Sequence, residues 1–543
     1  MTAAQRWNYG DIYDAMATAV EPAAPCLIQG DRVLTWADFT RRSNNLARGL
    51  ADRGIEVGDK VAFYLRNHPA YMELLGACFK GRFTHVNVNY RYVDEELYYI
   101  FDNSDSRVVL YGQEFADHIA ALKPRLPKVA LWLEVSDDGS LQLDGSEAFE
   151  VLAETGDGAP VAIERSPDDM LFIYTGGTTG MPKGVMWALE DLWFAGAAGA
   201  TPATDMIPPA TLAQHVENVR KAGGGSRIMP CCPLMHGTGL LTSIACLAGG
   251  GSLVLLEKPS FDPLECLEAI ERWQVNALAI VGDAFAKPLQ KALDGAPGRF
   301  DLSSLVSMIS SGVMWSMEVK RGLLEHHPGM VLTDSFGASE AVGFGRSDTT
   351  VDGTVETARF VIGEHCKVFT EDGREVKPGD PEPGFIARSG AIPRGYYKDP
   401  EKTAKTFPVI GGVRYSMPGD WCRVEADGSL VLLGRGSVCI NTAGEKVYPE
   451  EVEEVLKQHP DVDDALVVGV PDDKWGQMVT AVVQLHSGAE LDEDVLKRHA
   501  RERLAGYKTP KRILVKTSLG RASNGKADYK GITAFARSEL GLA

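Results

Sequence analysis

Short apolar runs in the first third of the chain predict strands, and stretches with apolar residues three or four positions apart predict helices. The predicted strands cover residues 61–65, 86–89, 108–110 and 129–135, and the predicted helices cover residues 70–80, 93–101 and 115–122. Helices that separate consecutive strands are typical of parallel sheets covered by helical layers. We therefore expect a layered α/β architecture in this part of the chain.

The same alternation returns in the middle of the chain, where predicted strands cover residues 253–256, 277–281, 306–309 and 330–332. Asp262 and Pro263 have the side chains favoured at the N-cap and in the first turn of a helix. Leu264, Leu267 and Ile270 would lie on the buried face of that helix. This region therefore extends the α/β pattern.

Two stretches depart from this pattern. Residues 201–225 are rich in proline and glycine and predict an inserted loop, helix and loop, which we interpret as a lid or a pocket wall. Residues 378–434 are rich in glycine, proline and short β-like runs, and a smaller α+β unit follows them. The predicted elements of that unit are a helix from Pro449, strands at 465–470 and 479–485, and a helix at 491–504.

These patterns predict the α/β fold class and two domains. Residues 1–434 would form a large N-terminal domain of layered α/β subdomains with a β-rich subdomain. Residues 435–543 would form a small α+β C-terminal domain. A chain of 543 residues is too long for a single core, which agrees with this division.

Composition and charge limit the classes of function. The chain is 44% apolar and 24% charged, as is usual for globular proteins. A net charge of −19 would repel nucleic acids and anionic membranes, so we expect neither as a partner. The start lacks the apolar core of a signal peptide, and no run approaches the roughly 18 apolar residues of an integral membrane segment.

The nine cysteines are scattered between Cys26 and Cys439 without a Cys-x-x-Cys pair. This spacing favours reduced, buried thiols in a cytoplasmic protein. We also allow for assembly of the chain as a homodimer.

Residues 171–184 are the strongest candidate for chemistry. An apolar run, which predicts a buried strand, breaks here into a loop of glycines and threonines that ends at Lys183. Glycines let backbone N–H groups turn toward a ligand, and hydroxyls and a lysine add donors and charge, so this loop suits a polyphosphate. Lys183 is followed by Gly184 rather than serine or threonine, which excludes the Walker pattern. The alternative is a flexible glycine-rich surface loop.

Four later positions carry further candidate chemistry. In the segment 334–340 (Asp-Ser-Phe-Gly-Ala-Ser-Glu), Phe336 would stack on a base and Glu340 would offer a hard oxygen ligand to a divalent cation. Asp420 would bind ribose hydroxyls. Lys526 lies in a basic tail. Taken singly, each of these residues is more often an ordinary surface charge or core side chain.

In their order and spacing, however, these motifs resemble the adenylate-forming superfamily of acyl-CoA synthetases, amino-acid adenylation domains and luciferases. The resemblance extends from about Asp31 to Lys526. It rests on the glycine-threonine loop, Phe-Gly-Ala-Ser-Glu, Gly-Tyr-Tyr, Gly-Asp, Gly-Arg and the terminal Gly-Lys. Residues 434–453 look like a bacterial acyl-CoA synthetase branch that includes enzymes for fatty acids and steroid side-chain carboxylates.

The resemblance implies that ATP with Mg²⁺ activates a carboxylic acid as an acyl-AMP, and that CoA then accepts the acyl group. The implied nucleotide- and CoA-binding residues are Thr175, Gly176, Gly177, Thr178, Thr179, Gly180, Lys183, Gly312, Asp334, Ser335, Phe336, Gly337, Ser339, Asp420, Arg435 and Gly444. The implied catalytic residues are Lys526, Glu340, Thr175 and His236, with Glu340 as the metal ligand. Lys526 would bridge the substrate carboxylate and the α-phosphate.

In this family the small C-terminal domain also rotates between the two half-reactions, which implies a mobile domain here. The family usually has aspartate or lysine at the hinge, two positions after the arginine, whereas this chain has Ser437. Serine permits the backbone change but removes the charge.

The acid itself is predicted from the pocket walls. His236, in Pro-Leu-Met-His-Gly, would gate the acyl pocket or touch the carboxylate, unless it is simply a packed histidine at a turn. Gly237 stands where amino-acid adenylation domains place an aspartate for the substrate ammonium, which argues against an amino acid. The other wall segments, 281–286, 310–315 and 338–345, are mostly small and apolar, which favours a hydrophobic acid.

Two alternatives to a CoA ligase stay open at this point. One is an acyl-AMP ligase that loads a carrier protein. The other is a nucleotide-binding protein without catalysis.

Overall fold

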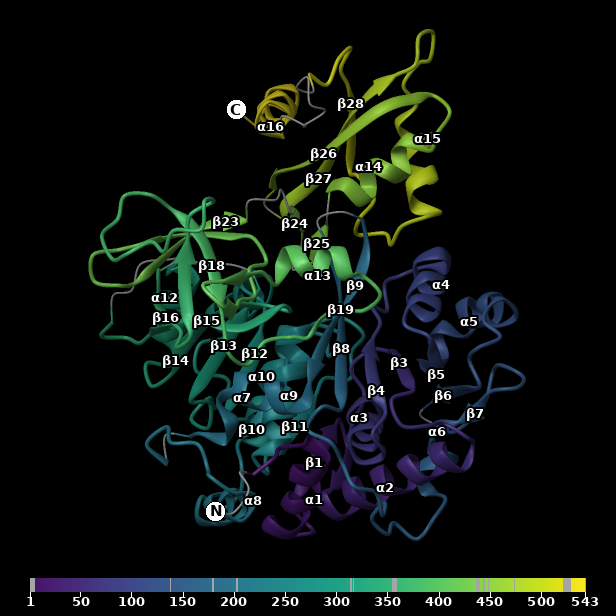
Figure 1. Cartoon of the computed structure of the whole chain (residues 1–543), viewed down its shortest axis with the longest axis vertical. Helices are drawn as coiled ribbons and strands as arrows, with labels where there is room; N and C mark the ends of the chain where they lie inside the picture. The colour runs from purple at the N-terminus through teal and green to yellow at the C-terminus, as the bar shows by residue number, and fades with distance from the viewer. Residues whose placement is uncertain are drawn as a thin grey trace. The chain divides into compact units, whose positions relative to one another are not determined.

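The computed structural model describes residues 5–542 apart from residues 137, 178–179, 202–203, 313–314, 316, 354–358, 436–439, 443–444, 448, 473 and 521–528. Most of its helices and strands are labelled in Figure 1. The chain divides into two compact units: a larger one made of Met1–Tyr90, Phe101–Ile173 and Gly184–Leu433, and a smaller one made of Arg91–Ile100, Tyr174–Lys183 and Gly434–Ala543. The mixed α/β fold with one large and one small part confirms the predicted fold class.

An eight-stranded sheet has the strand order β19-β9-β8-β4-β3-β5-β6-β7. Its strands are β3 (Lys60–Tyr64), β4 (Thr84–Asn87), β5 (Ser106–Gly112), β6 (Leu131–Val135), β7 (Glu147–Ala148), β8 (Met170–Gly177), β9 (Gly180–Ala188) and β19 (Gly395–Tyr396). The strands from β8 to β7 in this order pair in parallel. The predicted helices between them are present as α3 (Pro69–Gly81), α4 (Asp94–Asn103) and α5 (Ala116–Leu122). The alternating pattern at the start of the chain therefore predicted this layer correctly.

A thirteen-stranded sheet has the order β17-β18-β22-β23-β16-β15-β14-β13-β12-β10-β11-β1-β2. Its strands are β1 (Pro25–Gln29), β2 (Arg32–Thr35), β10 (Arg227–Pro230), β11 (Ser252–Leu255), β12 (Ala277–Ile280), β13 (Ser307–Ser311), β14 (Val331–Ala338), β15 (Ala341–Thr349), β16 (Arg359–Ile362), β17 (Cys366–Phe369), β18 (Gly384–Arg388), β22 (Asp420–Val424) and β23 (Leu430–Arg435). Pairing is parallel from β1 through β11, β10, β12 and β13 to β14. It becomes antiparallel at β15, where the β-rich part begins.

Helices cover this sheet and connect its parallel strands (Figure 1). Those between its strands are α9 (Gly237–Ala248), α10 (Pro263–Trp273), α11 (Asp283–Gly295) and α12 (Met317–His326). The remaining helices and strands of the larger unit are α1 (Tyr9–Ala19), α2 (Trp36–Asp52), α6 (Phe149–Glu154), α7 (Leu189–Ala195), α8 (Leu212–Lys221), α13 (Pro400–Thr406) and the hairpin β20 (Val409–Ile410) and β21 (Val413–Arg414). Within the predicted insert, α8 packs through His215 against Trp193, with ring centroids 5.3 Å apart.

Helix α10 shows how local sequence sets an element boundary. The Asp262 side chain accepts hydrogen bonds from Leu264 N at 2.9 Å and Glu265 N at 3.2 Å, and proline occupies the first turn, as predicted. Leu264 was expected on the buried face, but it is 43% exposed. The buried stripe is instead formed by Cys266, Leu267 and Ile270, and begins two residues after Leu264.

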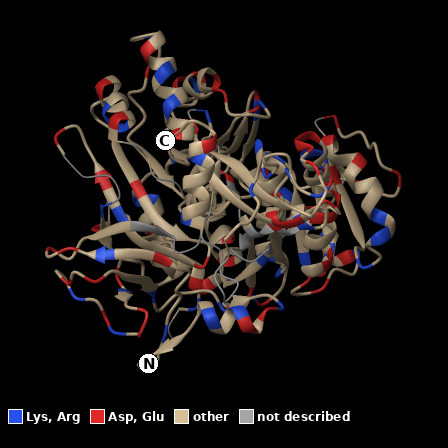
Figure 2. Cartoon of the chain, turned by 90° about the horizontal axis from the view of Figure 1, so that it is seen from above, with Lys and Arg blue, Asp and Glu red and all other residues tan. Residues whose placement is uncertain are grey.

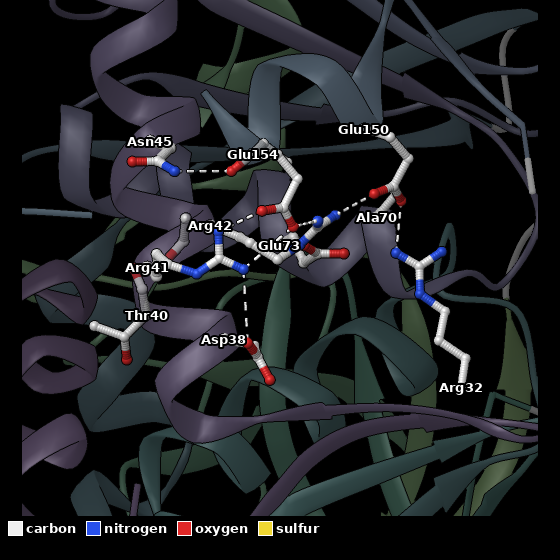
Figure 3. Close-up of polar contacts among 12 residues, drawn as sticks. Arg32, Asp38, Thr40, Arg41, Arg42, Asn45, Ala70, Glu73, Glu150 and Glu154 are labelled. Carbon is white, nitrogen blue, oxygen red and sulfur yellow. Dashed lines mark hydrogen bonds and ion pairs between the residues drawn. The ribbon is translucent and has the colours of Figure 1, made fainter. Parts of the chain in front are cut away.

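A buried charge cluster links three helices of the larger unit (Figure 3). Arg42 of α2 is 2% exposed and forms an ion pair with Glu73 of α3, whose side chain is fully buried. The same guanidinium contacts Glu150 at 2.9 Å and Glu154 at 2.5 Å, both on α6. Burial raises the pKa of Glu73, and the nearby Arg42 opposes that rise.

The smaller unit has its own sheet and core. Its strands are β24 (Ile440–Thr442), β25 (Glu445–Val447), β26 (Val462–Asp472), β27 (Gly476–Leu485) and β28 (Arg512–Val515), and its helices are α14 (Pro449–Lys457), α15 (Glu493–Arg501) and α16 (Tyr529–Glu539). The predicted helix from Pro449 is confirmed, with Val452 and Leu456 fully buried. Lys508 and Glu96, both in this unit, form an ion pair of 2.7 Å with each side chain 3% exposed.

The net charge of −19 is spread over the molecule. Figure 2 shows acidic and basic residues interspersed along the same helices and loops. Among the described residues, no helix has the length and apolar content needed to cross a membrane.

Candidate active site

The glycine-threonine segment differs from its predicted form. We expected a loop over residues 175–184, but β8 continues through Thr175, Gly176 and Gly177, and β9 begins at Gly180 and includes Lys183. The two strands are hydrogen-bonded neighbours. Glycine on its own disfavours a strand, but its backbone can adopt the extended form, and pairing between the two strands overrides the local loop tendency. Thr178 and Thr179 lie outside the described residues.

Gly312 directly follows β13, and Asp334 lies in the neighbouring strand β14, one residue before the parallel pairing of the two strands ends. Ser310 pairs with Asp334, and Ser311 pairs with Ser335, in the register of β13 and β14. Gly312 follows directly, with φ +91°, a conformation that favours glycine. The carboxyl ends of parallel strands are where α/β sheets bind ligands, so this placement suits the predicted nucleotide site.

A buried lysine contacts the Asp334 carboxylate. Lys320 of α12 is 2% exposed, and its Nζ forms an ion pair with Asp334 Oδ2. The same ammonium lies 5.6 Å from the centre of the Trp315 ring. Burial raises the pKa of Asp334, and Lys320 opposes this by favouring the charged form. Local sequence gave no sign of Lys320, because the contact joins a helix to a strand.

Phe336 lies in the core of the β-rich part. It is 7% exposed, and its ring centroid lies 5.2 Å from those of both Phe344 and Phe360. Gly337 lies where an added Cβ would stand 3.1 Å from the Ala341 carbonyl oxygen, so the chain approaches itself closely there. Base stacking by Phe336 stays a prediction.

Glu340 lies in the turn that joins β14 to β15, and three side chains from distant segments bind this turn. Trp187 Nε1 donates to the Ser339 carbonyl at 2.9 Å, and Ser416 Oγ donates to the Glu340 carbonyl at 2.6 Å. Tyr396 Oη donates to Glu340 Oε1 at 2.7 Å. The turn is therefore held at both its backbone and its carboxylate.

The Glu340 turn fits one type of magnesium site. The described part of the chain contains no group of three or more His, Cys, Asp or Glu side chains that could hold a metal ion. Mg²⁺ is usually bound by one or two carboxylates together with substrate phosphates and waters rather than by a protein cage. A single held carboxylate such as Glu340 matches that pattern.

Of the remaining predicted nucleotide-binding and catalytic residues, some lie in described strands and others lie outside the described residues. Asp420 is the first residue of β22 and is 6% exposed. Arg435 is the last residue of β23 and belongs to the smaller unit, as do Thr175 and Lys183. Gly444, Ser437 and Lys526 lie outside the described residues, so their predicted roles stay predictions.

Two asparagines hold the segment that leads to His236. Asn67 donates through Nδ2 to the Cys232 carbonyl at 3.1 Å and accepts through Oδ1 from Leu234 N at 2.8 Å. Asn87 Nδ2 donates to the Met235 carbonyl at 2.7 Å. His236 itself is the half-buried N-cap residue of α9. Sequence reasoning missed both asparagines, because Asn67 has the look of an ordinary turn residue, Asn87 lies in a predicted strand, and both act on a segment distant in sequence.

Comparison with known proteins identifies the family. The AMP-binding enzyme family matches residues 15–397, and the AMP-binding enzyme C-terminal domain matches residues 451–526. The chain is 39% identical to 3-oxocholest-4-en-26-oate–CoA ligase of Rhodococcus rhodochrous, over 98% of this chain and 96% of that one. It is 40% identical to a medium/long-chain-fatty-acid–CoA/3-oxocholest-4-en-26-oate–CoA ligase of Mycobacterium marinum, over 96% and 95%.

A solved structure supports the same fold. An amide bond synthetase from Marinactinospora thermotolerans superposes with a TM-score of 0.80 at 24% identity, covering 97% of this chain and 99% of that one. At 24% identity, this structural similarity supports the fold and not the activity. From the two family matches and the full-length relatives, the chain belongs to the AMP-binding enzyme family, in the acyl-CoA synthetase branch of the adenylate-forming superfamily.

Proposed function

We propose that this chain is an ATP-dependent ligase that joins a hydrophobic carboxylic acid to CoA. Asp334 within β14 and the Glu340 turn that follows this strand carry this proposal, in a chain that aligns over nearly its whole length with CoA ligases. The cysteines support a cytoplasmic enzyme, because all eight that the structure describes are free thiols.

The first half-reaction overcomes the poor electrophilicity of a carboxylate. A carboxylate oxygen attacks the α-phosphorus of ATP, the bond to the bridging oxygen of the β-phosphate breaks, and pyrophosphate leaves. Thr175 and Lys183 would bind the phosphates, Asp334 would bind the adenine, and Lys526 would bridge the carboxylate and the α-phosphate. Mg²⁺, held by Glu340, would offset the charge on the phosphates.

The second half-reaction transfers the acyl group. The CoA sulfur attacks the acyl carbonyl carbon, the bond to the phosphate oxygen breaks, and AMP leaves with the electron pair while the thiol proton passes to solvent. No protein nucleophile is required. Gly444 would let the thiol-bearing arm approach the backbone closely.

The substrate class follows from the pocket walls and the relatives. Gly237 faces open space, with no atom within 4 Å of an added Cβ, and offers no charge to an ammonium group. Trp187, Trp193 and Trp315 are at most 4% exposed and belong to the core. The two relatives are named for fatty acids and a steroid side-chain acid, and we propose the same classes for this chain.

The test is product analysis with a panel of fatty, branched, aromatic and sterol-derived acids, ATP and CoA. We expect AMP, pyrophosphate and acyl-CoA in equal amounts with at least one hydrophobic acid. Accumulation of acyl-AMP with transfer only to a carrier protein would support the alternative ligase. Absence of pyrophosphate release with every acid would refute the proposed function.

A further inference from the structure

The tyrosine pair of the Gly-Tyr-Tyr motif has no role in the reaction described so far. Tyr396 belongs to β19, which pairs with β9 through Gly395–Met186 and Tyr396–Val185. It is 5% exposed, yet its hydroxyl reaches the carboxylate of Glu340, 56 residues away in sequence. A buried phenol directed at the proposed metal ligand requires an explanation beyond core packing.

The ring of Tyr396 is fixed independently of Glu340. Its backbone N–H donates to Thr403 Oγ1 at 2.9 Å, and its ring packs edge-on against Phe407 with centroids 5.8 Å apart. Lys402 Nζ also lies 5.4 Å from the centre of the Tyr396 ring. Gly395 has φ +143°, and an added Cβ there would stand 2.4 Å from Thr403 Cγ2. The hydroxyl therefore occupies a set position before any ligand binds.

Two of the contacts at the Glu340 turn bind the backbone, and the third binds the Glu340 side chain. Trp187 and Ser416 bind carbonyl oxygens, so they fix where the turn lies but leave the Glu340 side chain able to rotate. Among the residues that the structure describes, only the Tyr396 hydroxyl binds the Glu340 carboxylate. A hydrogen bond to one oxygen sets the plane of the carboxylate and leaves the other oxygen for a cation.

We propose that Tyr396 is a positioning residue that orients the Glu340 carboxylate toward the Mg²⁺ of the bound nucleotide. This inference rests on the proposed function, in which Glu340 holds that cation. Partners that orient a metal ligand typically contribute 10- to 100-fold to metal affinity. We expect a loss of about that size when the hydroxyl is removed.

Tyr396→Phe removes the hydroxyl and keeps the ring, so the fold should persist. Tyr397→Phe is the matched control: its hydroxyl donates to Asp105 at 2.8 Å, and it makes the same chemical change one residue away. Mn²⁺ binding to the full-length protein with α,β-methylene-ATP, followed by electron paramagnetic resonance, measures cation affinity without turnover. The Mg²⁺ concentration for half-maximal AMP formation gives a second readout.

Tyr396→Phe should weaken Mn²⁺ binding about 10-fold or more and raise the Mg²⁺ concentration for half-maximal AMP formation by a similar factor. For Tyr397→Phe, both values should stay within about 2-fold of those of the parent protein. A Tyr396→Phe protein within 2-fold of the parent in both measurements would overturn the inference. Adding Tyr396→Phe to Glu340→Gln should cause no further loss, and a second 10-fold loss there would also overturn it. A parent protein that forms no acyl-AMP refutes the proposed function, whereas the Mn²⁺ measurement still decides the role of Tyr396.

Discussion

Replacement of Arg42 by methionine should destabilise the larger unit by about 3–5 kcal/mol. Arg42 is 2% exposed and Glu73 is fully buried, so the substitution leaves a buried carboxyl without its main counter-charge. Glu150 and Glu154 contribute less, because they are 23% and 51% exposed, and exposed ion pairs are worth roughly 0–1 kcal/mol. Most of the lost stability therefore comes from leaving the Glu73 carboxyl without its ion pair.

The loss should depend on pH in a defined direction. Burial raises the pKa of Glu73 above its ordinary value of 4.5, and removing Arg42 takes away an opposing effect. The folded protein then keeps a proton that the unfolded chain releases, so stability falls as pH rises above 4.5. The slope should approach its limit of about 1.4 kcal/mol per pH unit for one group. The deficit should be smallest near pH 5 and largest near pH 8.

Urea unfolding followed by tryptophan fluorescence at pH 5 and pH 8 measures this deficit. Arg53→Met is the matched control, because its ion pair with Glu147 is exposed at 36% and 44%. The double variant Arg42→Met/Glu73→Met replaces the buried pair with apolar side chains and should recover most of the loss. The reasoning is wrong if Arg42→Met costs no more than Arg53→Met, or if the double variant is no more stable than Arg42→Met.

Three further substitutions test the site itself. Lys526→Ala should lower acyl-AMP formation by at least about 100-fold and leave thioester formation from supplied acyl-AMP nearly intact; an equal loss in both half-reactions would contradict the role of Lys526. Lys320→Met should raise the KM for ATP about 10-fold, most strongly at low pH where the buried Asp334 takes up a proton, and an unchanged ATP titration would remove Asp334 from the nucleotide site. Asn67→Ala should raise the KM for the acid more than that for ATP, because it frees the backbone before His236, and equal changes in both constants would indicate a general loss of structure.

The sequence predicted what depends on near neighbours along the chain. The N-cap of α10 needs only Asp262 and the two N–H groups that follow it, and the parallel layers follow from alternating patterns. The extended form of residues 175–177 was missed, since it depends on strand pairing rather than on glycine's own preference. Lys320 and Asn67 were missed because each acts on a segment that is distant in sequence.

The smaller unit illustrates the same limit. Arg91–Ile100 and Tyr174–Lys183 group with the C-terminal stretch in space, although each is embedded in the sequence of the larger unit. The composition of Arg91–Ile100 is ordinary, and the glycines and threonines of Tyr174–Lys183 predict a phosphate-binding loop rather than this grouping. The buried Lys508–Glu96 ion pair, which joins residues 412 positions apart, is the kind of contact that a one-dimensional pattern cannot encode.

The three contacts at the Glu340 turn also bear on folding. They join positions separated by 56, 76 and 152 residues, from segments that must all be assembled before the turn is complete. Contacts of such long range form late, because closing the intervening loops costs entropy before the contacts form. A cation-bearing nucleotide would thus recognise only the finished fold, and in a cell rich in ATP it would shift the balance from partly folded chains toward the native enzyme.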